Sequence, residues 1–411
     1  AFLYQGLAQD AKGRKMSKSL GNVIEANSLL RKSSADVFRF YVLWKCSPVD
    51  SMNFDVGEMS RRPYQVLGTL YHLHRFFMQN AEYDNFNPQT HTLEWAKENK
   101  VLKPPDHWLL SKLQATVKNV ADKIETCEFQ FALSELEEFV VENVSRQYVP
   151  MVRRDLWSDD PKTLNRRLAV YATLWQTLRT LVLLFNPATP YLSEFLHQKV
   201  YREMDNSLPE SVNLESWPKP EEKLQDTALE QEFDALLRCV SLVYSARQSA
   251  QLKRRWPLRK AVVVAPKHLQ KAFKKLEEVF LELANVKEVE YLEELPEVNL
   301  KKWASASGEG LHVLLDKSRD RTLLGEGVMR DLARRVQALR KELGFMPTDI
   351  LEAVHVAELD PESVGLLEPY LAEMAELVRA KKVHVYRERS ELRVQWHEIT
   401  LDDRRMYVAI S

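Results

Sequence analysis

Two lysines three residues apart, Lys15 and Lys18, are the side chains in this sequence best suited to phosphate chemistry. A cationic loop can close over a polyphosphate and neutralise the charge that develops as a phosphorus–oxygen bond breaks. A solvated surface turn is the usual alternative for two lysines at this spacing, and the flanking Gly13 and Gly21 would permit a hinge. Both lysines are candidate catalytic residues, and the serines beside them are expected to shape and cap the loop. The candidate loop consists of Lys15, Met16, Ser17, Lys18 and Ser19.

A second group of candidates combines arginine with aromatic residues between positions 146 and 167. Unstacked RNA bases stack on aromatic rings and phosphates bind guanidinium groups, so this composition suits an RNA loop. Acidic residues at 155, 159 and 160 offer the alternative of a charged helix end whose arginines are paired and whose tryptophan lies in the core. We favour RNA binding for Arg146, Tyr148, Arg153, Arg154 and Trp157, and the same cluster contains Arg166 and Arg167.

Two further basic clusters lie later in the chain. The first contains no acidic residue and comprises Arg247, Lys253, Arg254, Arg255, Arg259 and Lys260. Like charge of this density is unfavourable unless it is solvated or bound to an anion, so we favour RNA contacts by Arg247, Arg254 and Arg255. The second comprises Arg330, Arg334, Arg335, Arg340 and Lys341. For that cluster, a solvated helix face paired with Asp331 and Glu342 is an equally good interpretation.

The composition is that of an ordinary globular protein. At 411 residues the chain is long enough for two to four domains, and its net charge of −1 means that an RNA partner would have to bind local basic patches. The three cysteines stand far apart and the histidines show no ligand spacing, so the sequence predicts neither a zinc site nor a disulfide framework and suits a reducing cytosol. The longest apolar run, Leu181–Phe185, is too short to cross a membrane, and no signal peptide is visible.

Three kinds of structure are expected to position these candidates in a fold that is mainly α with α+β. Residues 1–60 carry the lysine loop and one clear helix, for which Asp36 is the predicted N-cap. Residues 61–256 repeat the apolar period of long amphipathic helices, which predicts an antiparallel helical bundle. Residues 257–411 alternate β-branched runs with helical segments, which predicts a carboxy-terminal α/β region, and two modules in series, 257–324 and 325–411, would account for it.

The lysine loop resembles the KMSKS signature of class I aminoacyl-tRNA synthetases, with Gly6 and Asp10 before it and Gly21–Ile24 after it. The resemblance implies that Lys15 and Lys18 help to hold ATP, with Mg²⁺ in the whole enzyme, while an amino-acid carboxylate attacks the α-phosphate and an aminoacyl-adenylate forms. It also implies that residues 1–60 are the end of a Rossmann-type catalytic domain that contacts the tRNA stem. The HIGH-type motif of the family is absent, so we expect a carboxy-terminal fragment that is inactive alone.

Four further stretches extend the resemblance. Ala35–Tyr41 is similar to a stretch of the isoleucine, valine, leucine and methionine subgroup of this family, with Ser34 just before it where the family usually has glycine. Phe139–Trp157 and Phe185–Glu194 resemble the isoleucyl type, and so does Gly325–Gly327 followed by Arg334–Gly344. The resemblance implies an isoleucine–tRNA ligase whose bundle, residues 61–256, binds the anticodon and whose carboxy-terminal region contacts tRNA. The sequence lacks the carboxy-terminal zinc cysteines of one bacterial subtype and is closer to the archaeal-like subtype.

Two alternatives remain at this point. A valyl-tRNA synthetase fragment would typically end in a heptad-rich coiled coil, which is not visible here, and a non-catalytic tRNA-binding module would not need the lysine loop. The expected partners are tRNA, in particular isoleucine tRNA, ATP, and amino-terminal catalytic and editing domains outside this sequence. We expect a monomer in the cytoplasm with no membrane contact.

Overall fold

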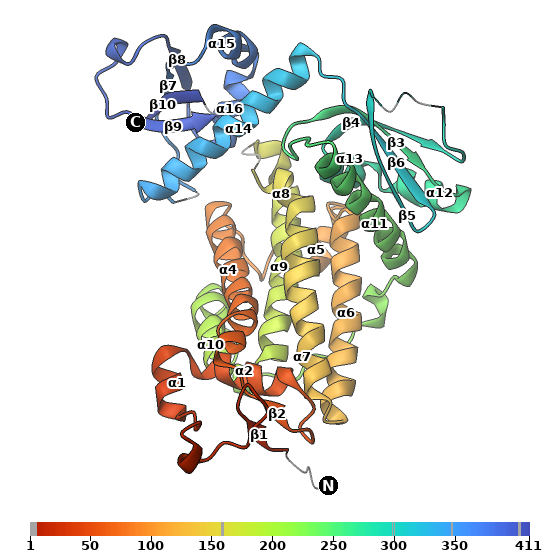
Figure 1. Ribbon diagram of the computed structural model, residues 1–411, viewed down its shortest axis with the longest axis vertical. Helices are drawn as coiled ribbons and strands as arrows, with labels where there is room; N and C mark the ends of the chain where they lie inside the picture. The colour runs from red at the N-terminus through yellow and green to blue at the C-terminus, as the bar shows by residue number, and fades with distance from the viewer. Residues whose placement is uncertain (1–5, 158–159, 298, 300, 347, 402–403) are drawn as a thin grey trace. The chain divides into compact units, whose positions relative to one another are not determined.

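The computed structural model describes residues 6–157, 160–297, 299, 301–346, 348–401 and 404–411. The chain forms two compact units (Figure 1). The amino-terminal unit contains Ala1–Leu156 and Pro161–Thr227, and the carboxy-terminal unit contains Trp157–Asp160 and Ala228–Ser411. This division places the last helix of the predicted bundle with the carboxy-terminal unit, so the boundary at 256 stays a prediction.

The amino-terminal unit begins with a small platform. Strand β1 (Ala8–Gln9) pairs in parallel with β2 (Met52–Asn53), and the 3₁₀ turn η1 (Lys18–Leu20) lies between them in the chain. The helices here are α1 (Ala26–Lys32), α2 (Ala35–Lys45) and α3 (Val56–Met59). Helix α2 starts one residue before the predicted cap: Ser34 is its N-cap and accepts from the Val37 amide at 3.1 Å, so the prediction for Asp36 is wrong.

The helical bundle follows and confirms the long helices predicted from the apolar period. Its helices are α4 (Arg62–Tyr83), α5 (Leu93–Glu98), α6 (Pro104–Glu125), α7 (Phe129–Glu138), α8 (Val149–Trp157), α9 (Leu164–Phe185) and α10 (Pro190–Leu196). Segments with π-helical turns, Phe139–Tyr148 (η2) and His197–Arg202 (η4), continue α7 and α10. Short 3₁₀ turns cover Pro161–Thr163, Val212–Leu214 and Glu222–Leu224. Helix α9 is buried on most of its circumference, as its nearly continuous apolar sequence requires of a central helix.

The carboxy-terminal unit consists of two α/β modules, each introduced by a long helix (Figure 1). The first module contains α11 (Thr227–Ser249), β3 (Leu258–Val264), α12 (Lys267–Lys275), α13 (Glu277–Ala284), β4 (Val286–Leu292), β5 (Trp303–Gly308) and β6 (Leu311–Asp316). The second contains α14 (Arg321–Glu342), β7 (Val354–Ala357), α15 (Pro361–Leu367), the 3₁₀ turn Glu368–Tyr370, α16 (Leu371–Leu377), β8 (Val383–Tyr386), the 3₁₀ turn Arg389–Glu391, β9 (His397–Leu401) and β10 (Arg404–Ile410).

The two modules share one topology. Their sheets have the orders β4-β3-β6-β5 and β8-β7-β10-β9. In each sheet the first two strands of the module are parallel, and the following hairpin returns antiparallel to the first strand. Each residue of α11 corresponds to the residue 93 positions later in α14. With this alignment, eight of the nine buried positions of α11 are also buried in α14. Because topology and burial pattern repeat together, equivalent positions in the two modules can be compared directly.

Candidate functional site

The lysine loop is shaped by contacts between residues close in the sequence. Lys15 forms an antiparallel bridge with Gln9, and η1 begins three residues later. The hydroxyl of Ser17 accepts a hydrogen bond from the amide at the end of this turn, at 3.3 Å, which confirms the capping role predicted for this serine. The hydroxyl of Ser19 lies 3.1 Å from that of Ser17. Gly21 ends the turn at a φ of 65°, a conformation that glycine adopts without strain.

Asn22 ties the two sides of the loop together. Its amide nitrogen donates to the Asp10 carboxylate at 3.0 Å and to the Lys15 carbonyl at 3.2 Å. Its amide oxygen accepts from the backbone amide of Ser17 at 2.9 Å. One side chain therefore holds three points of the loop, including the backbone of the first lysine.

Asp10 is the anchor for this arrangement. Its carboxylate accepts from the Arg14 guanidinium at 2.8 and 2.9 Å and from the backbone amides of Lys12 and Arg14 at 3.0 and 2.9 Å. The hydrogen bond from Asn22 and these other bonds hold the pKa of Asp10 well below its usual range. The holding role of Asp10, Arg14 and Asn22 was not predicted from the sequence. The available signal was the pair of turn-forming residues, Asp and Asn, on either side of a glycine-flanked loop.

The two lysines themselves are exposed. Within the described residues, neither the Lys15 nor the Lys18 ammonium has a hydrogen-bond or ion-pair partner. Met16 and Ser17 are half-buried, whereas Lys15, Lys18 and Ser19 face solvent. The result is a fixed backbone that presents two unpaired cations, which suits a polyanion arriving from solution.

Two of the stretches that carry the family resemblance, Ala35–Tyr41 and Phe185–Glu194, meet in the amino-terminal unit. The Asp36 carboxylate accepts from the Leu192 and Tyr191 amides at 2.6 and 3.4 Å, so this aspartate caps α10 and not its own helix. Burial raises the pKa of Asp36, and these amides oppose that shift. Arg39 donates to the carbonyls of Pro187 and Ala188 at 2.8 and 3.1 Å. Helix α2, which follows the loop and α1 in the chain, is thereby held to the segment that leads into α10.

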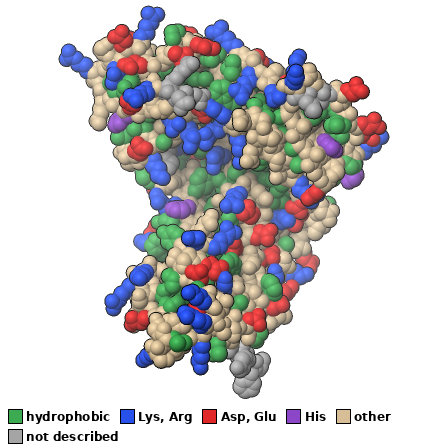
Figure 2. All heavy atoms as spheres, in the orientation of Figure 1, with side chains coloured by type: hydrophobic (Ala, Val, Ile, Leu, Met, Phe, Trp, Pro, Cys, Tyr) green, Lys and Arg blue, Asp and Glu red, His purple; other side chains and the backbone are tan. Residues whose placement is uncertain are grey.

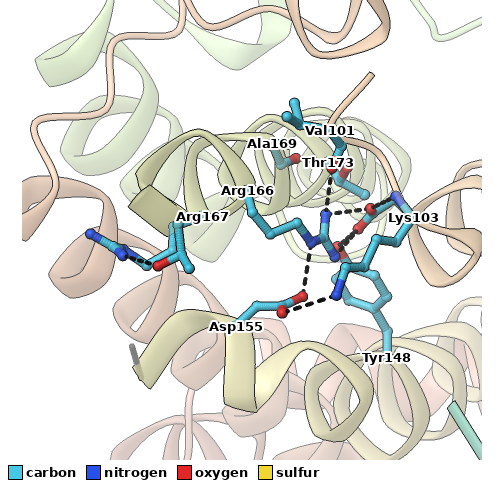
Figure 3. Close-up of polar contacts among 10 residues, drawn as sticks. Val101, Lys103, Tyr148, Asp155, Arg166, Arg167, Ala169 and Thr173 are labelled. Carbon is cyan, nitrogen blue, oxygen red and sulfur yellow. Dashed lines mark hydrogen bonds and ion pairs between the residues drawn. The ribbon is translucent and has the colours of Figure 1, made fainter. Parts of the chain in front are cut away.

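Part of the first arginine cluster lies in the bundle core (Figure 3). Tyr148 is fully buried and donates to the Asp106 carboxylate at 2.7 Å. Arg166 donates to Asp106 at 2.5 Å and to Asp155 at 2.8 Å. Figure 3 shows Asp155 and Tyr148 turned toward the Arg166 guanidinium. Since Tyr148 is closed off from solvent, we leave it out of the proposed RNA surface.

Arg167, the next residue of α9, is also paired with an aspartate inside the bundle. It forms two bonds of 2.8 Å to the Asp84 carboxylate, which also accepts from the Tyr171 hydroxyl at 2.6 Å. Its guanidinium also donates to the Thr163 hydroxyl at 2.9 Å. This arginine therefore joins α9 to the end of α4 inside the core.

The other members of the first cluster are accessible. Arg146, Arg153 and Arg154 are exposed on the helix that runs from η2 into α8. Arg146 pairs with Glu142 at 2.5 Å, an exposed contact one turn away. Trp157, the last residue of α8, is 44% exposed although tryptophan favours the core, so the predicted alternative of a core tryptophan is wrong.

The second basic cluster is also divided by burial. Arg247 is 1% exposed and donates to four backbone carbonyls, those of Lys253, Trp256, Ala284 and Asn285, at 2.9–3.1 Å. Burial lowers the pKa of Arg247 to about 10, which leaves the group charged at neutral pH. We therefore leave Arg247 out of the RNA surface, whereas Arg254 and Arg255 are exposed.

Within the described residues, no group of three or more His, Cys, Asp or Glu side chains is arranged to hold a metal ion. One helical stretch, Pro161–Phe185, is long and apolar enough to cross a membrane, but 78% of its apolar window is buried inside the structure. Such burial is typical of the core helix of a soluble protein.

Two family descriptions match this chain. Residues 1–55 match the class I tRNA synthetases of the I, L, M and V group, and residues 106–263 match the anticodon-binding domain of tRNA ligases. The solved ternary complex of LeuRS, tRNA and LeuAMS from Agrobacterium radiobacter is 21% identical, with a TM-score of 0.39 over 54% of this chain and 24% of that one. The lysine loop lies in the first matched segment and the bundle from residue 106 onward lies in the second, and the chain belongs to the class I tRNA synthetase family.

Within that family the similarity is to isoleucine–tRNA ligases along nearly the whole chain. The enzyme of Pyrococcus furiosus is 31% identical over 97% of this chain and 42% of its own length. That of Methanopyrus kandleri is 31% identical over 99% of this chain and 43% of its own. The chain therefore spans about two-fifths of the length of the curated relatives it matches.

Proposed function

We propose that this chain supplies the ATP-closing loop and the tRNA-binding part of an isoleucine–tRNA ligase, an enzyme that activates isoleucine with ATP and transfers it to tRNA. The observation that carries the proposal is the lysine loop, whose backbone is held by Asp10 and Asn22 while Lys15 and Lys18 stay unpaired within the described residues. A loop with this geometry needs little reorganisation before it meets a charged ligand.

The chemistry of the loop fits a triphosphate better than a metal ion. Lys15 and Lys18 would bind the phosphates of ATP and oppose the charge that builds on the leaving pyrophosphate, while Met16, Ser17 and Ser19 shape the contact. Magnesium prefers carboxylate and phosphate oxygens, but the loop carboxylate, Asp10, is already held by Arg14 and Asn22. Mg²⁺ would therefore arrive with ATP and find its other ligands elsewhere in the whole enzyme.

The tRNA side of the proposal rests on exposed arginines with an accessible aromatic ring. In the bundle these are Arg146, Arg153, Arg154 and Trp157, and in the carboxy-terminal unit they are Arg254 and Arg255. Guanidinium groups bind phosphates and stack on bases, and an accessible indole ring adds a stacking platform. We place the enzyme in the cytoplasm as a monomer.

The first test uses the purified chain and isoleucine tRNA, the same tRNA with a changed anticodon, and valine tRNA, over a salt series. Tighter binding of the first tRNA is the expected result. Preference for valine tRNA would instead favour a valyl-tRNA synthetase, and equal, salt-sensitive binding of all three would leave a general RNA surface. Absence of tRNA binding at low salt would refute the proposal.

A second test separates the catalytic part from the binding part. The chain alone is expected to show no isoleucine-dependent ATP–pyrophosphate exchange, because its loop needs the rest of the active site. In the whole enzyme, Lys15→Ala and Lys18→Ala are expected to lower the exchange rate by about 100-fold each, the usual effect of removing one group that stabilises developing charge. Full activity of both variants would support a non-catalytic tRNA-binding module.

A further inference from the structure

The carboxy-terminal unit contains a strongly basic pocket with a cavity volume of about 740 Å³. Its cations come from two segments far apart in the sequence: Lys253, Arg254 and Arg255 follow α11, and Arg334 and Arg335 lie on α14. Against these five cations stand the carboxylates Glu282 and Asp331, which leaves a net charge of +3. Figure 2 shows a group of Lys and Arg side chains together on the face of this unit that is turned to the viewer.

Contacts within the pocket hold some of these groups and leave others available. The Arg254 guanidinium lies 3.6 Å from the centre of the Tyr244 ring, which fixes its plane. Asp331 accepts from the Trp256 indole at 2.7 Å and lies 3.3 Å from the Lys253 ammonium. Arg334 and Arg335 are exposed and have no ion pair within the described residues. The predicted pairing of these two arginines with Asp331 or Glu342 is therefore not formed within the described residues, where Asp331 pairs with Lys253 and Arg255 instead.

The second module shows which charges the fold requires. Arg340 of α14 is buried like Arg247 and donates to the carbonyls of Met346, Asp349 and Val378. Met346 and Asp349 follow Arg340 by six and nine residues, as Lys253 and Trp256 follow Arg247. The buried arginine therefore belongs to the shared architecture of both modules.

The surface cations do not belong to that architecture. The positions equivalent to Lys253 and Arg255 are Met346 and Thr348, and those equivalent to Arg334 and Arg335 are Ser241 and Leu242. The same turn and the same helix are thus built elsewhere in this unit without positive charge at these four positions. The fold does not require these cations, and bringing them together costs electrostatic free energy that a bound anion would offset.

We propose that this pocket binds phosphodiesters of the tRNA backbone, with Arg254, Arg334 and Arg335 as the contact residues. The proposal rests on the tRNA-binding function proposed above and names a site for it in the carboxy-terminal unit. Arginine forms two parallel bonds to a phosphate, and a stacked guanidinium loses little freedom on binding. A polyanion with regularly spaced charges suits cations on two segments better than a single small anion does.

The test uses the whole 411-residue chain and compares two triple variants with equal loss of charge. The pocket variant carries Arg254→Gln, Arg334→Gln and Arg335→Gln. The control carries Lys271→Gln, Lys274→Gln and Lys301→Gln, three exposed lysines of the same unit that do not line the pocket. If three phosphate contacts are lost, the slope of log affinity against log salt should fall by about 2, and tRNA affinity at about 0.1 M salt should fall roughly 100-fold. The control should stay within about threefold of the original chain.

A variant that is expected to increase tRNA affinity distinguishes a lost contact from a misfolded protein, because a damaged fold does not bind more tightly. Glu282→Gln raises the net charge of the pocket and is expected to tighten tRNA binding several-fold at low salt. Equal weakening by the pocket and control variants, or no response to Glu282→Gln, would overturn the pocket assignment while leaving tRNA binding intact. Phenylglyoxal modifies accessible arginines, so a bound ligand protects the pocket arginines from it. If poly-glutamate protects them and tRNA does not, the pocket is assigned to an acidic protein segment. If the original chain, without substitutions, does not bind tRNA at all, the proposed function itself is refuted.

Discussion

Replacing Arg166 by methionine is expected to destabilise the amino-terminal unit without removing an RNA contact. The Asp106 carboxylate is fully buried, and Arg166 is the cation that compensates it, with bonds of 2.5 and 3.3 Å. Without the guanidinium this carboxylate keeps the neutral donors Tyr148 and the Lys103 amide, each at 2.7 Å. Breaking a buried ion pair by removing one partner costs about 3–5 kcal/mol.

That free energy translates into a large thermal shift. For a unit of this size, about 1 kcal/mol lowers the midpoint by about 2–4 °C, so the expected decrease is roughly 6–20 °C. Differential scanning calorimetry is the suitable assay, because the two units can unfold in separate transitions. Arg146→Met is the matched control: its ion pair with Glu142 is exposed, so its midpoint should move by less than about 2 °C.

Two outcomes would refute the reasoning about Arg166. One is a midpoint within about 2 °C of the original chain. The other is a loss of tRNA affinity at unchanged stability, which would return Arg166 to the RNA surface. The double variant Asp106→Leu/Arg166→Met gives a further check. Because it removes both charges together, it should be more stable than Arg166→Met alone.

Three further predictions concern His74 in the bundle, Asn22 in the lysine loop and Arg340 in the carboxy-terminal unit. Burial lowers the pKa of His74 to about 4, below the value of about 6.5 for an unfolded histidine, so unfolding takes up a proton between these values. Stability should be complete above about pH 6.5 and fall by about 1.4 kcal/mol per unit toward pH 4, and thermal scans of His74→Gln should lack that slope. Asn22→Ala in the whole enzyme should lower the rate of ATP–pyrophosphate exchange about tenfold with little change in tRNA affinity; an unchanged rate would remove its positioning role. Arg340→Met should destabilise the carboxy-terminal unit by about 3 kcal/mol, visible in hydrogen exchange, while tRNA affinity remains.

The helices were predictable because their signal is local. A short window of sequence within α4 or α9 already shows the apolar period of a helix, and proline and asparagine mark the ends of these helices. The partner of a helix is not local information. Helix α11 has the same amphipathic pattern as the bundle helices, yet it groups with the carboxy-terminal unit. Its apolar face would suit either neighbour, and only packing decides between them.

The lysine loop was recognisable for a related reason. The hydrogen bonds that shape it, as described above, lie between residues 9 and 22, so the capping role of Ser17 followed from position alone. The role of Asp36 did not, because it depends on a helix more than 150 residues away that supplies the amides of Tyr191 and Leu192. Sequence spacing identifies a residue that can cap a helix, whereas the fold determines which helix it caps.

The basic clusters show the limit of reading charge density along a sequence. Arg247 and Arg254 stand seven residues apart in one cluster, but the first satisfies backbone carbonyls in the core and the second lies on Tyr244 at the surface. Every residue has a backbone carbonyl, so no residue type near Arg247 in the sequence indicates that carbonyls will accept its hydrogen bonds. The paired modules supply the missing criterion: a cation that recurs in both, as Arg247 recurs in Arg340, is needed by the fold, and a cation present in only one is not. By that criterion Arg254, Arg334 and Arg335 call for a ligand, and Arg247 does not.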